Sequence, residues 1–134
     1  MQIQRIDHYT IRCTREQLPS LRQFYADVLG LNEGPRADFK FPGHWMYAGG
    51  FPLVHLAATS ETTGSLSTST GNLDHIAFRT SDLAATRVRL RQYGIAFREL
   101  PVPGMPLHQV FLQDPLGIKL ELTFDAAKEA AALS

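Results

Sequence analysis

Two short stretches of the sequence place a histidine in the same setting. RIDHYTIRC, residues 5–13, and NLDHIAFRT, residues 72–80, each carry Asp-His followed by an alternating run typical of a β-strand. The two histidines, His8 and His75, are 67 positions apart. Two imidazoles and one carboxylate form the set that binds a divalent first-row metal and leaves coordination positions open. With Glu121 as the carboxylate, His8 and His75 are candidate metal ligands.

Strand alternation tests whether these polar residues lie on one kind of face. In the run IKLELTF, residues 118–124, the apolar residues occupy alternate positions and leave Glu121 on the other face. His75 opposes its apolar neighbours in the same way. His55, 66 positions before Glu121, also opposes its apolar neighbours, although Leu53 and Ala57 accompany it. A lone strand histidine is ordinarily structural, but two at matched positions with a parity-matched glutamate favour a metal site.

These residues belong to predicted strands and helices that occur in the same order twice along the chain. Each copy begins with a strand and continues with an amphipathic helix, 18–31 with Pro19 in its first turn and 81–94 with Ser81 as its N-cap. Further strands follow at 44–49 and 52–58 in the first copy and at 95–100, 108–113 and 118–124 in the second, with a loop expected at 32–43. The sequence predicts an α+β fold of two paired β-α-β-β-β modules.

The local composition of the sequence predicts the boundaries of the two modules, the linker and the tail. We expect a single domain, 1–134, made of module one (1–59), a Ser/Thr/Gly-rich linker (60–72), module two (73–124) and an alanine-rich tail helix (125–134).

Composition limits the partners of this chain. Its 134 residues, 44% of them hydrophobic, fit one ordinary domain or two half-size units sharing a core. Thirteen basic and thirteen acidic residues cancel, without a basic block, which excludes nucleic acid and anionic membranes as natural partners. The single cysteine, Cys13, forms no internal disulfide, and the first ten residues lack a basic start followed by an apolar run, so we do not expect secretion. We expect a cytoplasmic protein with a small-molecule ligand.

The chain resembles the vicinal oxygen chelate superfamily of glyoxalase I, type I extradiol dioxygenases, fosfomycin-resistance transferases and bleomycin-binding proteins. The resemblance rests on IDHYTIR, FYADVLGL, LDHIAFR and QDPLGIKLEL, and extends to about Phe124. It implies that the paired modules form a half-open barrel around a metal held by His8, His75 and Glu121. It also implies a homodimer. Fe(II) is favoured as the metal, although Mn, Ni, Co and Zn accept the same ligands.

Residue 55 separates the branches of this superfamily. Glyoxalase I-like members usually supply a carboxylate ligand from this strand, and the histidine here disfavours that branch. Extradiol dioxygenases instead place a separate acid/base histidine in the first module. The resemblance therefore favours an extradiol-type dioxygenase acting on a small catechol, with His55 as the catalytic acid/base. A fourth ligand and a core histidine are the other roles open to His55, and a glyoxalase-like lyase or isomerase is the alternative enzyme.

Three further residues are candidates for the substrate pocket. Trp45 suits stacking on an aromatic substrate or filling the core. The proline-rich segment 101–109 could either hold His108 over the site or simply connect two strands. Phe111 takes the position where classical ring-cleaving enzymes, which are about twice as long, carry a tyrosine.

Two other branches fit the sequence less well. Fosfomycin-type transferases need a cluster of cationic donors for a phosphonate. This chain has three lysines, and the arginines of module two lie mainly on or near a helix: Arg79, Arg87, Arg89, Arg91 and Arg98. Metal-free binding proteins of the bleomycin-binding type lack the triad.

Overall fold

The computed structural model of the chain describes residues 1–60 and 70–132. It divides into two compact units, unit 1 (residues 1–67) and unit 2 (residues 68–134), and each is described by itself. No helix in the described ranges is long and apolar enough to cross a membrane.

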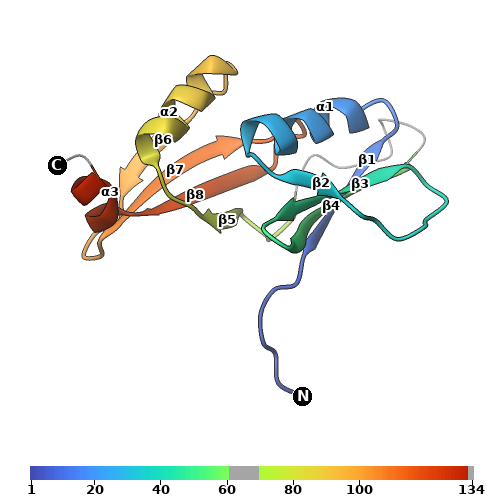
Figure 1. Ribbon diagram of the computed structural model, residues 1–134, viewed down its shortest axis with the longest axis horizontal. Coiled ribbons are helices and arrows are strands. Elements are labelled where there is room, and N and C mark those ends of the chain that lie inside the picture. The colour runs from blue at the N-terminus through green and yellow to red at the C-terminus, as the bar shows by residue number, and fades with distance from the viewer. Residues whose placement is uncertain (61–69, 133–134) are drawn as a thin grey trace. The chain divides into compact units, whose positions relative to one another are not determined.

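Unit 1 is a four-stranded mixed sheet with one helical segment. Its elements are β1 (Tyr9–Thr14), α1 (Leu18–Gln23), the π-helical turn η1 (Phe24–Val28), β2 (Asn32–Gly34), β3 (Gly43–Ala48) and β4 (Phe51–Ser60). The strand order is β1-β4-β3-β2, with β1 and β4 parallel and the other pairs antiparallel (Figure 1).

Unit 2 repeats this plan. Its elements are β5 (Ile76–Arg79), α2 (Leu83–Gln92), β6 (Arg98–Pro101), β7 (Leu107–Gln113), β8 (Lys119–Asp125) and α3 (Ala126–Ala132). The order β5-β8-β7-β6, with only β5 and β8 parallel, is the order of unit 1 (Figure 1). The predicted α+β class and the repeated β-α-β-β-β order are therefore confirmed.

Two local predictions differ from the structure. The segment expected to be wholly a loop, 32–43, begins with the short strand β2, which pairs with β3. Gly34 suits this strand because a Cβ there would lie 2.7 Å from Cε1 of Tyr47. The N-cap of α2 is Asp82 and not Ser81, because the Asp82 side chain reaches the Ala85 amide (3.1 Å).

The predicted linker falls largely on residues 61–69, which lie outside the described part of the chain. The tail contains the expected helix, α3.

Each sheet buries the alternate residues that the sequence pattern marks as apolar. In β4 these are Val54, Leu56 and Ala58, and in β8 they are Leu120, Leu122 and Phe124. We call this side of each sheet its helix face and the opposite side its site face. The site face contains His55 and Trp45, which are register partners in unit 1, and Glu121 and Phe111, which are register partners in unit 2.

Candidate metal and substrate site

Glu121 is the centre of a polar cluster on the site face of unit 2. Its side chain is 8% exposed, and a carboxylate so deeply buried requires hydrogen-bond partners. Gln109 Nε2 donates to Oε1 (3.1 Å), and Thr123 Oγ1 donates to Oε2 (2.5 Å). His75 Nε2 lies 3.1 Å from the same Oε1. Two of the three predicted metal ligands therefore lie together, with the carboxylate held by its neighbours on β7 and β8.

The aspartate that precedes each candidate ligand histidine makes a hydrogen bond with its ring. The Nδ1 atom of His8 lies 2.7 Å from Asp7 Oδ2, and that of His75 lies 2.7 Å from Asp74 Oδ2. These hydrogen bonds lower the pKa of both aspartates. A histidine that donates Nδ1–H to a carboxylate presents Nε2 to a metal, an arrangement common at metal sites. The repeated Asp-His dipeptide thus contains both a candidate ligand and its orienting group.

His55 lies between two other rings on the site face of unit 1. Its ring centroid is 3.8 Å from that of His8, with 9° between the planes, and 4.1 Å from that of Trp45, with 14° between the planes. Its Nε2 lies 3.0 Å from the carbonyl oxygen of Pro52, which can only accept a hydrogen bond. The Nε2 atom therefore bears the proton, and Nδ1 is the nitrogen able to accept one.

Burial and the adjacent His8 together lower the pKa of His55, against the opposing effects of the Pro52 carbonyl and Asp7. The cause named first, burial, penalises the charged imidazolium. The neutral imidazole is therefore favoured further into the acid range than for an ordinary histidine.

The predicted ligands belong to different units, His8 to unit 1 and His75 and Glu121 to unit 2. Over residues 1–60 and 70–132, no group of three His, Cys, Asp or Glu side chains is close enough to hold a metal ion. The donors nevertheless fit a divalent metal, because both histidines present Nε2 and the buried carboxylate lies beside one of them. The position between His75 Nε2 and Glu121 Oε1 suits either a proton or a cation.

The sequence of this chain matches the Glyoxalase/Bleomycin resistance protein/Dioxygenase superfamily over residues 5–122, most of its length. The chain belongs to this superfamily. The match includes both Asp-His pairs and Glu121. A search of curated proteins finds no match.

Several solved structures are similar in fold to this chain. A putative glyoxalase family protein from Bacillus anthracis is 21% identical with a TM-score of 0.73, over 93% of this chain and 98% of that one. The fosfomycin resistance protein FosX from Listeria monocytogenes is 18% identical with a TM-score of 0.69, over 96% and 98%. TnmS3, an antibiotic-binding protein from Streptomyces sp. CB03234, is 17% identical with a TM-score of 0.66, over 93% and 98%. At these identities the likeness establishes the fold alone.

Phe111 lies on the site face of unit 2 beside the candidate ligands His75 and Glu121. It is the register partner of Glu121, and its ring meets that of His75 edge-on with centroids 5.9 Å apart. Trp45 has the corresponding place in unit 1, beside His55. Both residues are thus positioned as walls of the candidate site within their own units.

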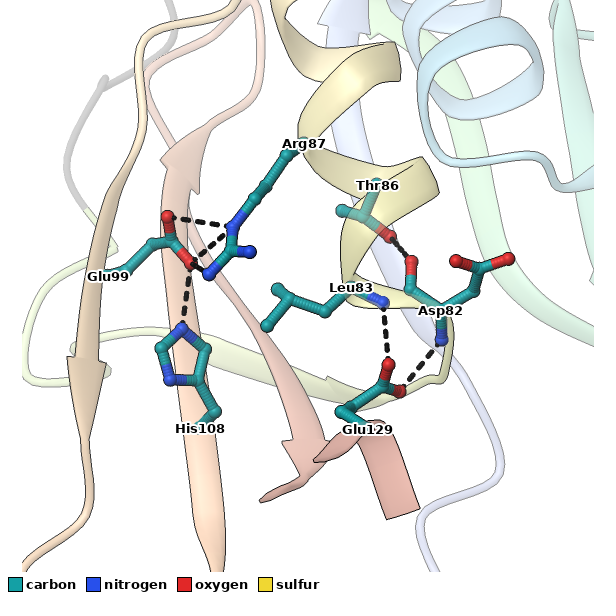
Figure 2. Close-up of polar contacts among 7 residues, drawn as sticks. All are labelled: Asp82, Leu83, Thr86, Arg87, Glu99, His108 and Glu129. Carbon is teal, nitrogen blue, oxygen red and sulfur yellow. Dashed lines mark hydrogen bonds and ion pairs between the residues drawn. The ribbon is translucent and has the colours of Figure 1, made fainter. Parts of the chain in front are cut away.

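His108 lies on the opposite side of its sheet. Strand alternation places it on the helix face, since its neighbour Gln109 contacts Glu121 on the site face. Its Nε2 lies 2.7 Å from Glu99 Oε1, and Arg87 of α2 donates to the same carboxylate at 2.9–3.1 Å (Figure 2). We therefore leave His108 out of the proposed substrate pocket.

Unit 1 contains the same cluster, which the sequence reasoning missed in both units. Arg22 Nε donates to Glu33 Oε2 (2.6 Å), and His44 Nδ1 lies 2.5 Å from Glu33 Oε1. In each unit the arginine comes from the helix, the glutamate from the edge strand and the histidine from the next strand. We call these the Arg-Glu-His clusters. They join three elements of each unit on the helix face.

Proposed function

We propose that this superfamily member is a metal-dependent enzyme for substrates with two adjacent oxygens, and specifically an extradiol-type dioxygenase for a small catechol. His8, His75 and Glu121 would hold one divalent metal, with Fe(II) favoured. The observation that carries the proposal is the repeated Asp-His pair, in which a carboxylate 2.7 Å from Nδ1 leaves each Nε2 for a metal.

When bound, the metal would supply the Lewis acidity and dioxygen chemistry that no side chain of this chain provides. The protein's own contribution begins with Glu121, which Gln109 and Thr123 hold in a fixed orientation. Its burial keeps water away from the carboxylate. Phe111 and Trp45 offer flat apolar surfaces against which an aromatic ring can stack.

His55 is the proposed acid/base. With Nε2–H donated to Pro52, its Nδ1 can take the proton of a substrate hydroxyl and later return it. The lowered pKa keeps the imidazole neutral, as a base requires at neutral pH. Stacking on both faces limits ring rotation.

The first experiment measures metal content on protein purified anaerobically without chelator, followed by dioxygen uptake with a panel of catechols. We expect one iron per site and uptake with at least one catechol. Stoichiometric nickel, cobalt or zinc without uptake would favour the lyase or isomerase. Failure to bind any metal after reconstitution would rule out the triad and favour a metal-free binding protein.

A pair of variants tests the orienting aspartates. Asp74→Asn should weaken metal affinity by about tenfold, the lower end of such effects, because the Asp74 side chain is 73% exposed. Asp27→Asn, at an exposed position of η1, is the matched control and should bind metal normally. Equal metal affinity of the two variants would show that Asp74 does not orient His75 for metal binding.

The proposal includes a homodimer and a cytoplasmic location. Light scattering on the purified protein tests the first, and cell fractionation tests the second.

A further inference from the structure

Arg98 lies across the site face of unit 2 from the candidate ligands. It opens β6, and its guanidinium carbon is 4.6 Å from the centre of the Phe111 ring. The register pairs Arg98 with Phe111 and Phe111 with Glu121, so the three residues form one row across three strands. Cα atoms two strands apart are separated by about 10 Å. The row thus has a cation at one end, a carboxylate beside the ligand histidine at the other, and an aromatic ring between them.

A second cation lies on the same ring. Lys119 Nζ is 5.1 Å from the centre of Phe111, but it also lies 3.1 Å from Asp74 Oδ2. The lysine charge is therefore compensated by the aspartate that orients His75. Arg98 differs, because it forms no ion pair with any carboxylate in the described ranges 1–60 and 70–132, and it is exposed. Its guanidinium is free to receive an anion.

The side chains of Arg98, Phe111 and Glu121 together suit one chemical class of ligand. A guanidinium presents a planar fork of donors that suits carboxylate and phosphonate oxygens. The Phe111 ring beneath it fixes its position and offers an apolar surface to the body of the ligand. A ring whose adjacent oxygens lie toward His75 and Glu121 would direct a substituent at its far end toward Arg98.

We propose that Arg98 is a specificity residue that selects substrates bearing an anionic oxygen group, a carboxylate or a phosphonate, opposite their two metal-binding oxygens. This inference rests on the proposed function, since the metal site fixes the other end of the substrate. It gives a role to an arginine that the sequence pattern assigned to the neighbourhood of a helix.

Binding to zinc-loaded protein tests the proposal without turnover. Calorimetry compares 3,4-dihydroxybenzoate with its uncharged methyl ester, which differ by one negative charge on the same catechol. We expect the acid to bind about tenfold more tightly than the ester, as for one charge-assisted hydrogen-bonded pair. This advantage should shrink as ionic strength rises. In a further arm, 3,4-dihydroxyphenylphosphonate shows which oxyanion fits better.

The variant Arg98→Gln should remove the advantage of the acid and leave the affinity of the ester unchanged. Arg89→Gln, at an exposed position of α2, is the matched control and should retain the advantage. Equal affinities of acid and ester for the wild-type protein, or an equal loss of both in Arg98→Gln, would overturn the role of Arg98 alone. Absence of zinc uptake, or of binding by either ligand, would overturn the proposed function and this inference with it.

Discussion

The two units share a strand order but secure their helices differently. In unit 1, α1 and η1 bury five apolar side chains against the sheet: Leu18, Leu21, Phe24, Tyr25 and Val28. In unit 2, Leu90 is the one buried residue of α2. Apolar burial scales with the area removed from water, so it holds the first helix far more strongly than the second.

In unit 2, α2 makes polar contacts at its N-terminus and through the side chain of Arg87. The amides of Asp82 and Leu83, at the start of α2, donate to Glu129 of α3 at 2.8 and 2.9 Å (Figure 2). The Arg87 guanidinium makes three contacts with Glu99, whereas Arg22 makes one with Glu33. The helix of unit 1 therefore buries more apolar side chains, and the helix of unit 2 makes more polar contacts.

The corresponding site-face positions of β4 and β8 hold different residues, His55 and Glu121, and replacing each of them tests this difference between the units most strongly. Glu121→Ala should abolish stoichiometric metal binding, because it removes a ligand. His55→Ala should keep the metal and lower turnover on the order of a hundred- to ten-thousand-fold, the usual contribution of an acid/base group. Elemental analysis and dioxygen uptake measure these effects.

Circular dichroism tests whether both variants fold, which we expect. Loss of metal in His55→Ala would make His55 a fourth ligand, and full occupancy in Glu121→Ala would remove that glutamate from the site.

The difference between the helices predicts the next largest effect. Leu21→Ala should lower the free energy of unfolding by about 2–5 kcal/mol, because Leu21 is fully buried. Glu129→Ala should cost about 1 kcal/mol, as for loss of a helix cap, and should speed hydrogen exchange at the Leu83 amide. Urea unfolding and hydrogen exchange measure the two effects.

Val88→Ala is the control for the helix of unit 2, because Val88 is 63% exposed and its loss should change stability by less than about 0.5 kcal/mol. A larger effect of Glu129→Ala than of Leu21→Ala would reverse the comparison.

Local alternation was enough to predict the repeat and the face of Glu121. The run 118–124 alternates strictly, and the neighbours of Glu121 at Leu120 and Leu122 are buried as that pattern requires. The sequence also displays the two Asp-His dipeptides. It does not predict the hydrogen bond between each histidine ring and the aspartate before it. The matched strand order of the units follows from this repetition.

The Arg-Glu-His clusters could not be predicted, because each joins residues from three elements. Their spacing also differs, 11 and 11 positions in unit 1 but 12 and 9 in unit 2, so no common motif appears. His108 belongs both to the predicted strand 108–113 and to the proline-rich segment 101–109, and the sequence did not decide which of them sets its direction. The strand does, because β7 begins at Leu107 and strand alternation then places His108 on the helix face. Long-range pairing of polar side chains depends on tertiary structure, which a single sequence does not display.

We expect the two clusters to differ also in their sensitivity to acid, which is the smallest effect expected to separate the units. Burial raises the pKa of Glu33, but hydrogen bonds from Arg22 and His44 outweigh it and the net shift is downward. Hydrogen bonds from Arg87 lower the pKa of Glu99, with a further contribution from His108. A lowered carboxyl pKa contributes stability above the unfolded value of about 4.3, which is lost as pH falls through the folded value.

Glu99→Gln should therefore flatten the acid limb of the stability curve more than Glu33→Gln does. The Glu99 side chain is less exposed, 24% against 35%, and receives more donors, so solvent screens it less. Each substitution should lower the free energy of unfolding by less than about 1 kcal/mol at neutral pH. At strongly acid pH, the stability of both variants should approach that of the wild type. Urea midpoints between pH 3 and pH 7, on chelator-treated protein, measure the two curves. A steeper acid limb in either variant than in the wild type would contradict the sign of the shift, and equal flattening would remove the distinction between the clusters.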